Sequence, residues 1–99
     1  MLEALSGTWK LHVKVGGKTG VATFQLEVAP ENTIRGTYSG HLGSAQVEGV
    51  ITGEHFEFWF DWHHGKVRYK GTCSDERMSG TCVYGSVGTG KFEGEKIVD

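Results

Sequence analysis

The sequence predicts an all-β domain, an eight-stranded antiparallel up-and-down (meander) barrel. Apolar and polar residues alternate with period two through eight short segments of the 99-residue chain. The connections between these segments are short, and such connections join antiparallel neighbours and leave no room for a crossover helix. No long stretch has helical periodicity. Closing such a sheet on itself covers both of its edge strands, so we expect the first strand to meet the last.

The first four predicted strands run from Gly7 to Val15, Val21 to Ala29, Thr33 to Ser39, and Ser44 to Thr52. Every second residue in them is apolar or glycine, which predicts one inward face per strand. These inward residues are Trp9, Leu11, Val13 and Val15, then Ala22, Phe24, Leu26 and Val28, then Ile34, Gly36 and Tyr38, and finally Ala45, Val47, Gly49 and Ile51. Turns rich in glycine or proline separate the strands.

The last four predicted strands run from His55 to Trp62, Lys66 to Cys73, Arg77 to Tyr84, and Val87 to Lys96. The same alternation continues in them, most clearly in the aromatic residues of the His55 to Trp62 strand. Their inward residues are Phe56, Phe58, Phe60 and Trp62, then Val67, Tyr69 and Gly71, then Met78, Gly80, Cys82 and Tyr84, and finally Gly88, Gly90, Phe92 and Gly94.

Glycine recurs at inward positions, at residues 36, 49, 71, 80 and 90. It weakens a flat strand but permits sharp coiling and close approach of two backbones. One interpretation is therefore the geometry of closure, and a second is that glycine clears space for a ligand opposite the aromatic strand. The two are compatible.

Composition limits the partners. We expect one domain over residues 1–99. The net charge of −2 lacks the basic excess that nucleic-acid binding requires, so no nucleic-acid partner is predicted. No apolar run is long enough to span a bilayer. The first seven residues resemble no secretory signal, because they lack a basic region and an apolar region.

The two cysteines are predicted to be free thiols. A turn at Asp75-Glu76 places Cys73 opposite Met78, and Cys82 then lies about 13 Å further along the ladder at about 3.3 Å per residue. A disulfide requires Cα atoms within about 7 Å. Free thiols are typical of a reducing compartment, and we expect a cytoplasmic protein.

The two ends of a meander barrel collect alternate connections. One end receives the loops at Gly16 to Gly20, Gly40 to Gly43, Trp62 to Gly65 and Gly85 to Gly88, which we expect to be the longer ones. Aromatic residues lie just beneath these loops, while Trp9 and Phe56 lie near the other end and are expected to plug it. An aromatic mouth with a few polar groups is typical of a small-molecule site, so the entrance is predicted at the loop end.

Gly7-Thr8-Trp9, at the start of the first strand, resembles the Gly-x-Trp signature of the calycins, the group of lipocalins, fatty-acid-binding proteins and streptavidin-like barrels. Residues 34–40 also resemble a strand of the streptavidin-like barrels, and the repeated Gly-Thr strands resemble those of small bacterial proteins. The resemblance implies an eight-stranded up-and-down barrel with Trp9 across the closed end. The chain departs from these families in its short length and in lacking a helical lid, a biotin-contacting set and an interior arginine.

The interpretation we favour is a non-enzymatic binder of a small apolar or aromatic molecule, which enters at the loop end. The predicted ligand-contacting residues, which supply ring walls and polar tips, are Tyr38, His41, Phe58, Phe60, Trp62, Tyr69 and Tyr84. We predict no cofactor and no metal. The residues that could ligate a metal are His41, His63, His64 and Asp61, but an exposed polar turn explains them better.

Two alternatives stay open. The first is a cofactor-free isomerase or cyclase in which Tyr38, Tyr69 or Tyr84 acts as a general acid. The second is a barrel filled by its own side chains that acts by association with a partner or as a homodimer. In that case the outward-facing Trp59 would lie at the interface.

Overall fold

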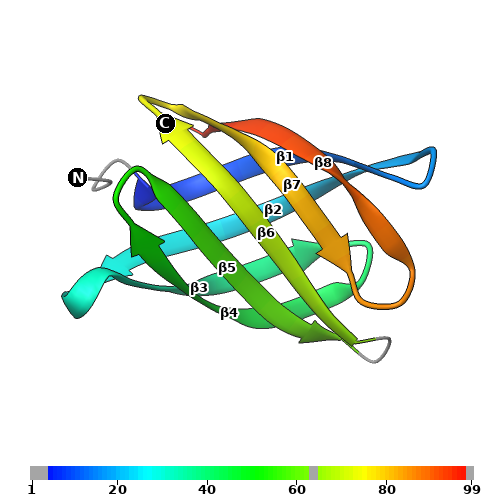
Figure 1. Ribbon diagram of the computed structural model, residues 1–99, viewed down its shortest axis with the longest axis horizontal. Coiled ribbons are helices and arrows are strands. Elements are labelled where there is room, and N and C mark those ends of the chain that lie inside the picture. The colour runs from blue at the N-terminus through cyan, green and yellow to red at the C-terminus, as the bar shows by residue number, and fades with distance from the viewer. Residues whose placement is uncertain (1–4, 63–64, 98–99) are drawn as a thin grey trace.

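The computed structural model describes residues 5–62 and 65–97. They form a closed barrel in which each of eight antiparallel strands pairs with the next and β8 returns to β1 (Figure 1). The predicted fold is therefore confirmed. The strands are β1 (Gly7–Val15), β2 (Lys18–Ala29), β3 (Thr33–Gly40), β4 (Gly43–Thr52), β5 (His55–Trp62), β6 (Gly65–Ser74), β7 (Arg77–Tyr84) and β8 (Gly88–Lys96). Among these residues, no helix is long and apolar enough to cross a membrane.

Strands β2, β3, β4 and β6 extend further into the turns than the sequence predicted, whereas β8 begins one residue later, at Gly88. Strand β2 begins at Lys18 rather than Val21, because Gly16 and Gly17 adopt φ values of 58° and 83° and close a two-residue hairpin. Pairing therefore runs to Val15 and Lys18, next to the tip. The expectation of longer loops at this end is wrong, since glycine there shortens the turns. The connection between β5 and β6, at His63 and His64, lies outside the described residues.

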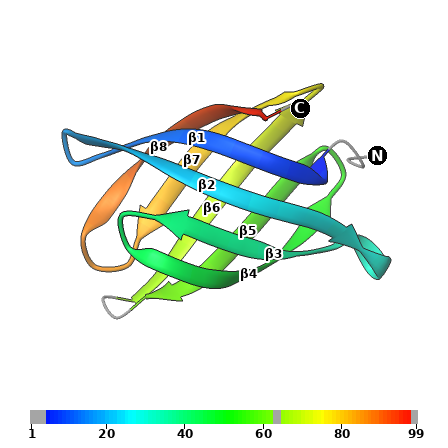
Figure 2. The same ribbon diagram turned by 180° about the vertical axis from the view of Figure 1, so that it is seen from behind.

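The period-two register is confirmed along the whole barrel. Every buried side chain within the strands belongs to the predicted inward set, and none of the buried described residues is polar or charged. Figure 2 shows the wall from behind, with β1 to β4 side by side. The barrel interior is therefore an apolar core, and the outer wall carries the charged residues.

Inward glycines lie across the ladder from bulky side chains. Gly49 pairs with Phe58, Gly71 with Phe56, and Gly80 with Phe92. A Cβ atom built on Gly71 would lie 2.0 Å from the carbonyl oxygen of Ser79. Not even one methyl group fits at Gly71, so these glycines do not leave space for a ligand. Of the two interpretations of the inward glycines, the geometry of barrel closure is therefore the one that applies.

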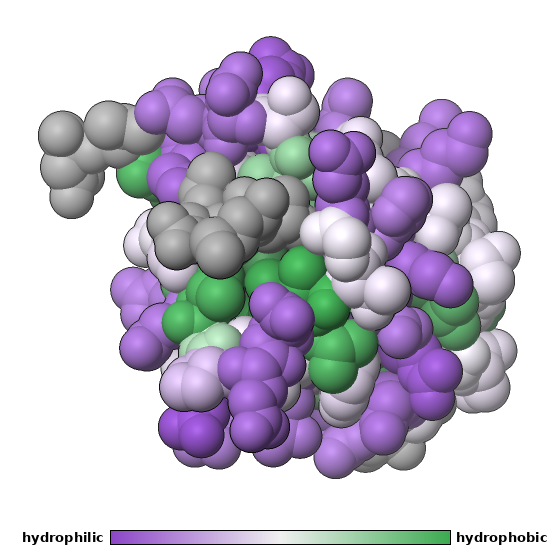
Figure 3. Space-filling view, turned by 60° about the vertical axis from the view of Figure 1, so that its left-hand side comes forward, coloured by the Kyte–Doolittle hydropathy of each residue, from purple (hydrophilic) through white to green (hydrophobic). Residues whose placement is uncertain are grey.

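Trp9 closes the end of the barrel opposite the mouth, as predicted. Its indole Nε1 donates a hydrogen bond to the carbonyl oxygen of Leu5 at 2.8 Å, and the Lys96 ammonium lies 5.3 Å from the ring centroid. Neither Leu5 nor Trp9 is exposed to solvent. Figure 3 turns this end towards the viewer and shows apolar residues gathered in its middle, with hydrophilic residues around them.

Both cysteines are free thiols, as predicted. Cys73 pairs with Met78, which is the register that the sequence implied, and Cys82 pairs with Tyr69 across the β6–β7 ladder. The separation along β7 keeps the two sulfur atoms apart.

The close approach at inward glycines predicts a large penalty for a single methyl group. A Cβ on Gly36 would lie 1.9 Å from the backbone oxygen of Gln25, whereas a Cβ on Gly20 would meet only the side chain of His41, at 3.6 Å. We expect Gly36→Ala to lower the free energy of unfolding in urea by about 1–3 kcal/mol or more, and Gly20→Ala to change it far less. Equal effects of the two substitutions would contradict the account of closure.

Candidate ligand site at the open end of the barrel

The end of the barrel opposite Trp9 holds a pocket of about 470 Å³. The β1–β2, β3–β4 and β7–β8 turns surround it, together with the last residues of β5 and β7. These turns lie at one end of the molecule, the right-hand end in Figure 1. The described residues that line the pocket are Val13, Val15, Lys18, Thr19, Gly20, Val21, Ala22, His41, Leu42, Trp62, Tyr84 and Val87. Its volume and mainly apolar walls are those of a small-molecule site.

Small and large side chains face each other across this pocket. Strands β1 and β2 contribute Val15, Gly20 and Ala22, whereas β5 and β7 contribute the rings of Trp62 and Tyr84. The small side chains leave space on one wall, and the rings supply apolar surface on the other. Both rings are half-buried, so they are accessible from the pocket.

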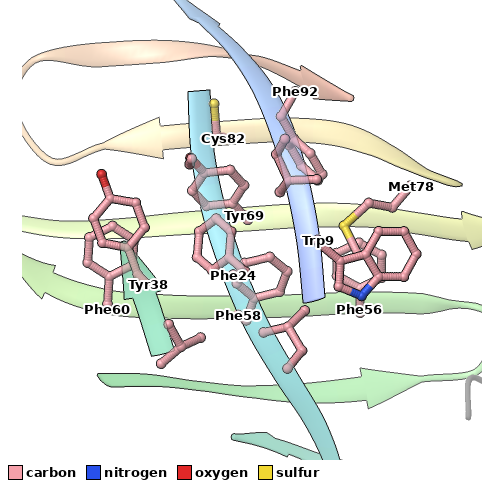
Figure 4. Close-up of a cluster of buried hydrophobic side chains, with 14 of the residues drawn as sticks. Trp9, Phe24, Tyr38, Phe56, Phe58, Phe60, Tyr69, Met78, Cys82 and Phe92 are labelled. Carbon is pink, nitrogen blue, oxygen red and sulfur yellow. The ribbon is translucent and has the colours of Figure 1, made fainter. Parts of the chain in front are cut away.

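A cluster of aromatic rings fills the barrel below the pocket. Phe24 lies at its centre, with ring centroids 5.0 Å from Phe58 and 5.1 Å from Tyr69. The Tyr38 and Phe60 rings stack at 4.3 Å. Figure 4 shows the rings running from Trp9 and Phe56 at one end of the cluster to Tyr38 and Phe60 at the other. This packing makes the cluster the floor of the pocket.

The hydroxyl groups of Tyr69 and Tyr84 are hydrogen-bonded to each other, and this pair joins the ring cluster to the pocket. Tyr69 is fully buried, and Tyr84 lines the pocket. Burial raises the pKa of Tyr69 above its ordinary value and raises the pKa of Tyr84 to about 12. Both phenols are therefore protonated at neutral pH, and they can donate a proton but cannot abstract one.

Tyr38 connects the ring cluster to the β3–β4 turn. Its ring is buried, and its hydroxyl oxygen accepts a hydrogen bond from the backbone N–H of Leu42 at 3.3 Å. Gly40 makes room for this hydroxyl, because a Cβ there would lie 2.6 Å from it. Tyr38 therefore fixes the turn that carries Leu42 and His41 at the pocket.

Three of the seven predicted ligand-contacting residues line the pocket: His41, Trp62 and Tyr84. The other four, which lie in the ring cluster below it, are Tyr38, Phe58, Phe60 and Tyr69. Sequence reasoning missed the apolar turn residues Leu42 and Val87. A signal for them was present, because each is the one apolar residue of a glycine-bounded turn, in Gly40-His41-Leu42-Gly43 and Gly85-Ser86-Val87-Gly88, and Val87 is 61% exposed.

A larger hollow of about 1010 Å³ lies on the outer wall over β1, β2, β7 and β8. Most of its lining residues are exposed and lie on the outward register, among them His12, Lys14, Lys91 and Glu93, although the buried inward residues Val13 and Phe92 also border it. Solvated charges of this kind are typical of an ordinary outer surface. The smaller pocket, at the open end of the barrel, is lined by the rings of Trp62 and Tyr84, and we take it as the candidate site.

The arrangement restricts the chemistry available. Burial raises the pKa of the Cys82 thiol to about 11, so this thiol is protonated at neutral pH and is a poor nucleophile. Among the described residues no three metal-ligating side chains come together, and two of the considered ligands, His63 and His64, lie outside that part of the chain. The isomerase or cyclase alternative stays a prediction, limited to acid catalysis by a tyrosine.

Trp59 lies on the outer wall of β5, on the outward register as predicted. It is half-buried rather than exposed, and the Lys66 ammonium lies 5.8 Å from its ring centroid. Its cross-strand neighbours are Glu48 and Arg68. Other apolar side chains on the outer wall, Val21, Val50 and Val83, are exposed.

The geometry defines a small closed barrel with an apolar pocket at one end. Two solved structures share this fold. One is a redesigned beta barrel, mFAP1, bound to DFHBI, with a TM-score of 0.68 and 13% sequence identity over 95% of each chain. The other is a de novo designed fluorescence-activating beta barrel, with a TM-score of 0.69 and 18% identity over 98% of this chain and 100% of that chain. No protein-family model and no curated protein sequence matches the chain.

The buried phenol pair predicts a loss of stability at high pH. The pKa of Tyr84 is about 12 in the folded protein and about 10 in the unfolded chain, so above pH 10 the unfolded chain releases this proton first. We expect the free energy of unfolding to fall as the pH rises from 10 towards 12. Urea titrations over this range should show a weaker decline for the Tyr69→Phe/Tyr84→Phe double variant. An unchanged decline would show that the pair does not contribute.

The association hypothesis for Trp59 is tested by sedimentation. It predicts that the wild-type protein sediments as a dimer and that Trp59→Ser, which removes the ring from the outer wall, sediments as a monomer. The same mass for both proteins would exclude Trp59 from any interface between copies of the chain.

Proposed function

We propose that the protein binds one small apolar or aromatic molecule in the pocket at the open end of the barrel. The observation that carries this proposal is a pocket of about 470 Å³ with Trp62 and Tyr84 on one wall, above an interior that rings already fill. The binding of DFHBI by mFAP1, a barrel of the same fold, supports the choice of a small molecule as the ligand.

Each predicted residue receives a role in this proposal. The rings of Trp62 and Tyr84 pack against the ligand, and His41 is a polar group at the rim of the pocket. Tyr38 holds the β3–β4 turn in place through its bond to Leu42. Phe58, Phe60 and Tyr69 form the rigid floor, because Phe58 stacks on Tyr69 and Phe60 stacks on Tyr38.

We also propose a calycin-type barrel in a reducing compartment such as the cytoplasm. The Gly-x-Trp segment at the start of β1, with Trp9 packed across the closed end, supports the first part of this proposal. The two free thiols support the second part.

Two tryptophans on β5 allow a matched test. Trp62 lines the pocket and Trp59 lies on the outer wall, and both are half-buried. We expect the uncharged fluorophore Nile red, titrated into the wild-type protein, to brighten on burial and to give a saturable curve. Trp62→Ser should weaken this binding by about tenfold, since the ligand loses one aromatic wall, and Trp59→Ser should leave it unchanged.

Circular dichroism of both variants establishes that the barrel is folded. A flat titration of the wild-type protein would contradict the proposed function. Equal weakening by Trp62→Ser and Trp59→Ser would contradict the location of the site.

A further inference from the structure

We propose that Tyr84 is a directed hydrogen-bond donor in the pocket, and that the ligand is an aromatic molecule with a carbonyl oxygen on its edge. This inference rests on the proposed function and specifies the class of ligand. It follows from the direction of the hydrogen bond between Tyr69 and Tyr84, and from which polar groups line the pocket.

The burial of Tyr69 determines that direction. A buried hydroxyl group carries one proton, and that proton needs an acceptor within reach. The side chain of Tyr69 has no solvent exposure, and its hydroxyl contacts the hydroxyl of Tyr84. Tyr69 therefore donates and Tyr84 accepts. The effect of the bond on acidity agrees, because it raises the pKa of Tyr69, whereas for Tyr84 it opposes the larger rise caused by burial.

The proton of Tyr84 is then available to a second partner. The Tyr84 ring lines the pocket, so this proton is on the side from which a ligand would approach. A hydroxyl that accepts a hydrogen bond is polarised and becomes a better donor. In the described part of the lining, the other hydroxyl, ammonium and imidazole groups belong to Thr19, Lys18 and His41, which are all exposed to solvent.

The polar groups of the pocket favour a ligand that carries a hydrogen-bond acceptor over a ligand that carries a cationic amine. Within the described lining residues there is no carboxylate that could pair with a cation. Tyr84 and Lys18 instead both donate. An aromatic ligand with a conjugated carbonyl group can accept the hydrogen bond of Tyr84 with its oxygen and pack its flat ring against Trp62. A ligand ring without such a group leaves the Tyr84 donor unpaired.

The test uses two uncharged fluorophores with the same skeleton. One is a dimethylaminonaphthalene with an alkyl ketone, and the other is the same dimethylaminonaphthalene without the ketone. The ratio of their two dissociation constants is measured for the wild-type protein and for Tyr84→Phe. We expect this ratio to change by about threefold to tenfold in the direction of lost preference for the ketone, which is the effect of one hydrogen bond.

Two further variants separate ligand recognition from folding. Tyr69→Phe keeps the hydroxyl of Tyr84 and should keep most of the preference for the ketone. The Tyr69→Phe/Tyr84→Phe double variant removes both hydroxyl groups, so no unpaired hydroxyl is left buried. It should lose the preference for the ketone. The infrared stretching frequency of the bound ketone should also be lower in the wild-type protein and in Tyr69→Phe than in the variants without the Tyr84 hydroxyl.

The outcomes distinguish this inference from the proposed function. If both probes bind the wild-type protein and the ratio is the same in Tyr84→Phe, the donor role of Tyr84 is wrong and the binding function stands. If neither probe binds the wild-type protein, the proposed function fails and the inference fails with it.

Discussion

The pairing of inward glycines with inward rings is the constraint on which the rest of this barrel depends. Closing a sheet with so few strands leaves a narrow interior that side chains from all strands must share. Here a ring on one strand lies opposite a glycine on its neighbour, as Phe58 does with Gly49 and Phe92 with Gly80. The glycines also let the backbones approach closely enough for the sheet to coil until β8 pairs with β1.

The same constraint determines where space remains. From Trp9 at the closed end to Tyr38 and Phe60, the rings contact one another and fill the interior. Beyond them, the inward residues of β1 and β2 become small, and the facing strands end in Trp62 and Tyr84. The pocket therefore lies where the aromatic side chains no longer fill the interior of the barrel. A ligand there would extend the stack of rings rather than displace it, and the hydrogen bond between the hydroxyl groups of Tyr69 and Tyr84 connects the pocket with the ring cluster.

The period-two pattern was enough to predict the fold, the closure and the inward face of every strand, because each side of the wall meets a different environment. The alternation of the short connections between the two ends of the barrel was enough to predict that Trp9 lies at the closed end. The turns were harder. Whether Gly16 to Gly20 forms a loop or a tight hairpin depends on positive φ values that the residue types permit but do not require. The sequence could not predict how much of the interior is filled by side chains, since this depends on how far the rings of Phe58, Phe60 and Tyr69 interdigitate. Leu42 and Val87 were overlooked because turns are usually polar.

The location of the ligand is the central claim, and methyl NMR spectroscopy tests it most directly. Nile red is titrated into protein with labelled valine, leucine and isoleucine methyl groups. The account predicts that the signals of Val15, Leu42 and Val87 at the mouth shift with a common dissociation constant. The signals of Leu5 at the closed end and of Val50 and Val83 on the outer wall should stay in place. Shifts confined to Val50 and Val83, or no shifts at all, would contradict it.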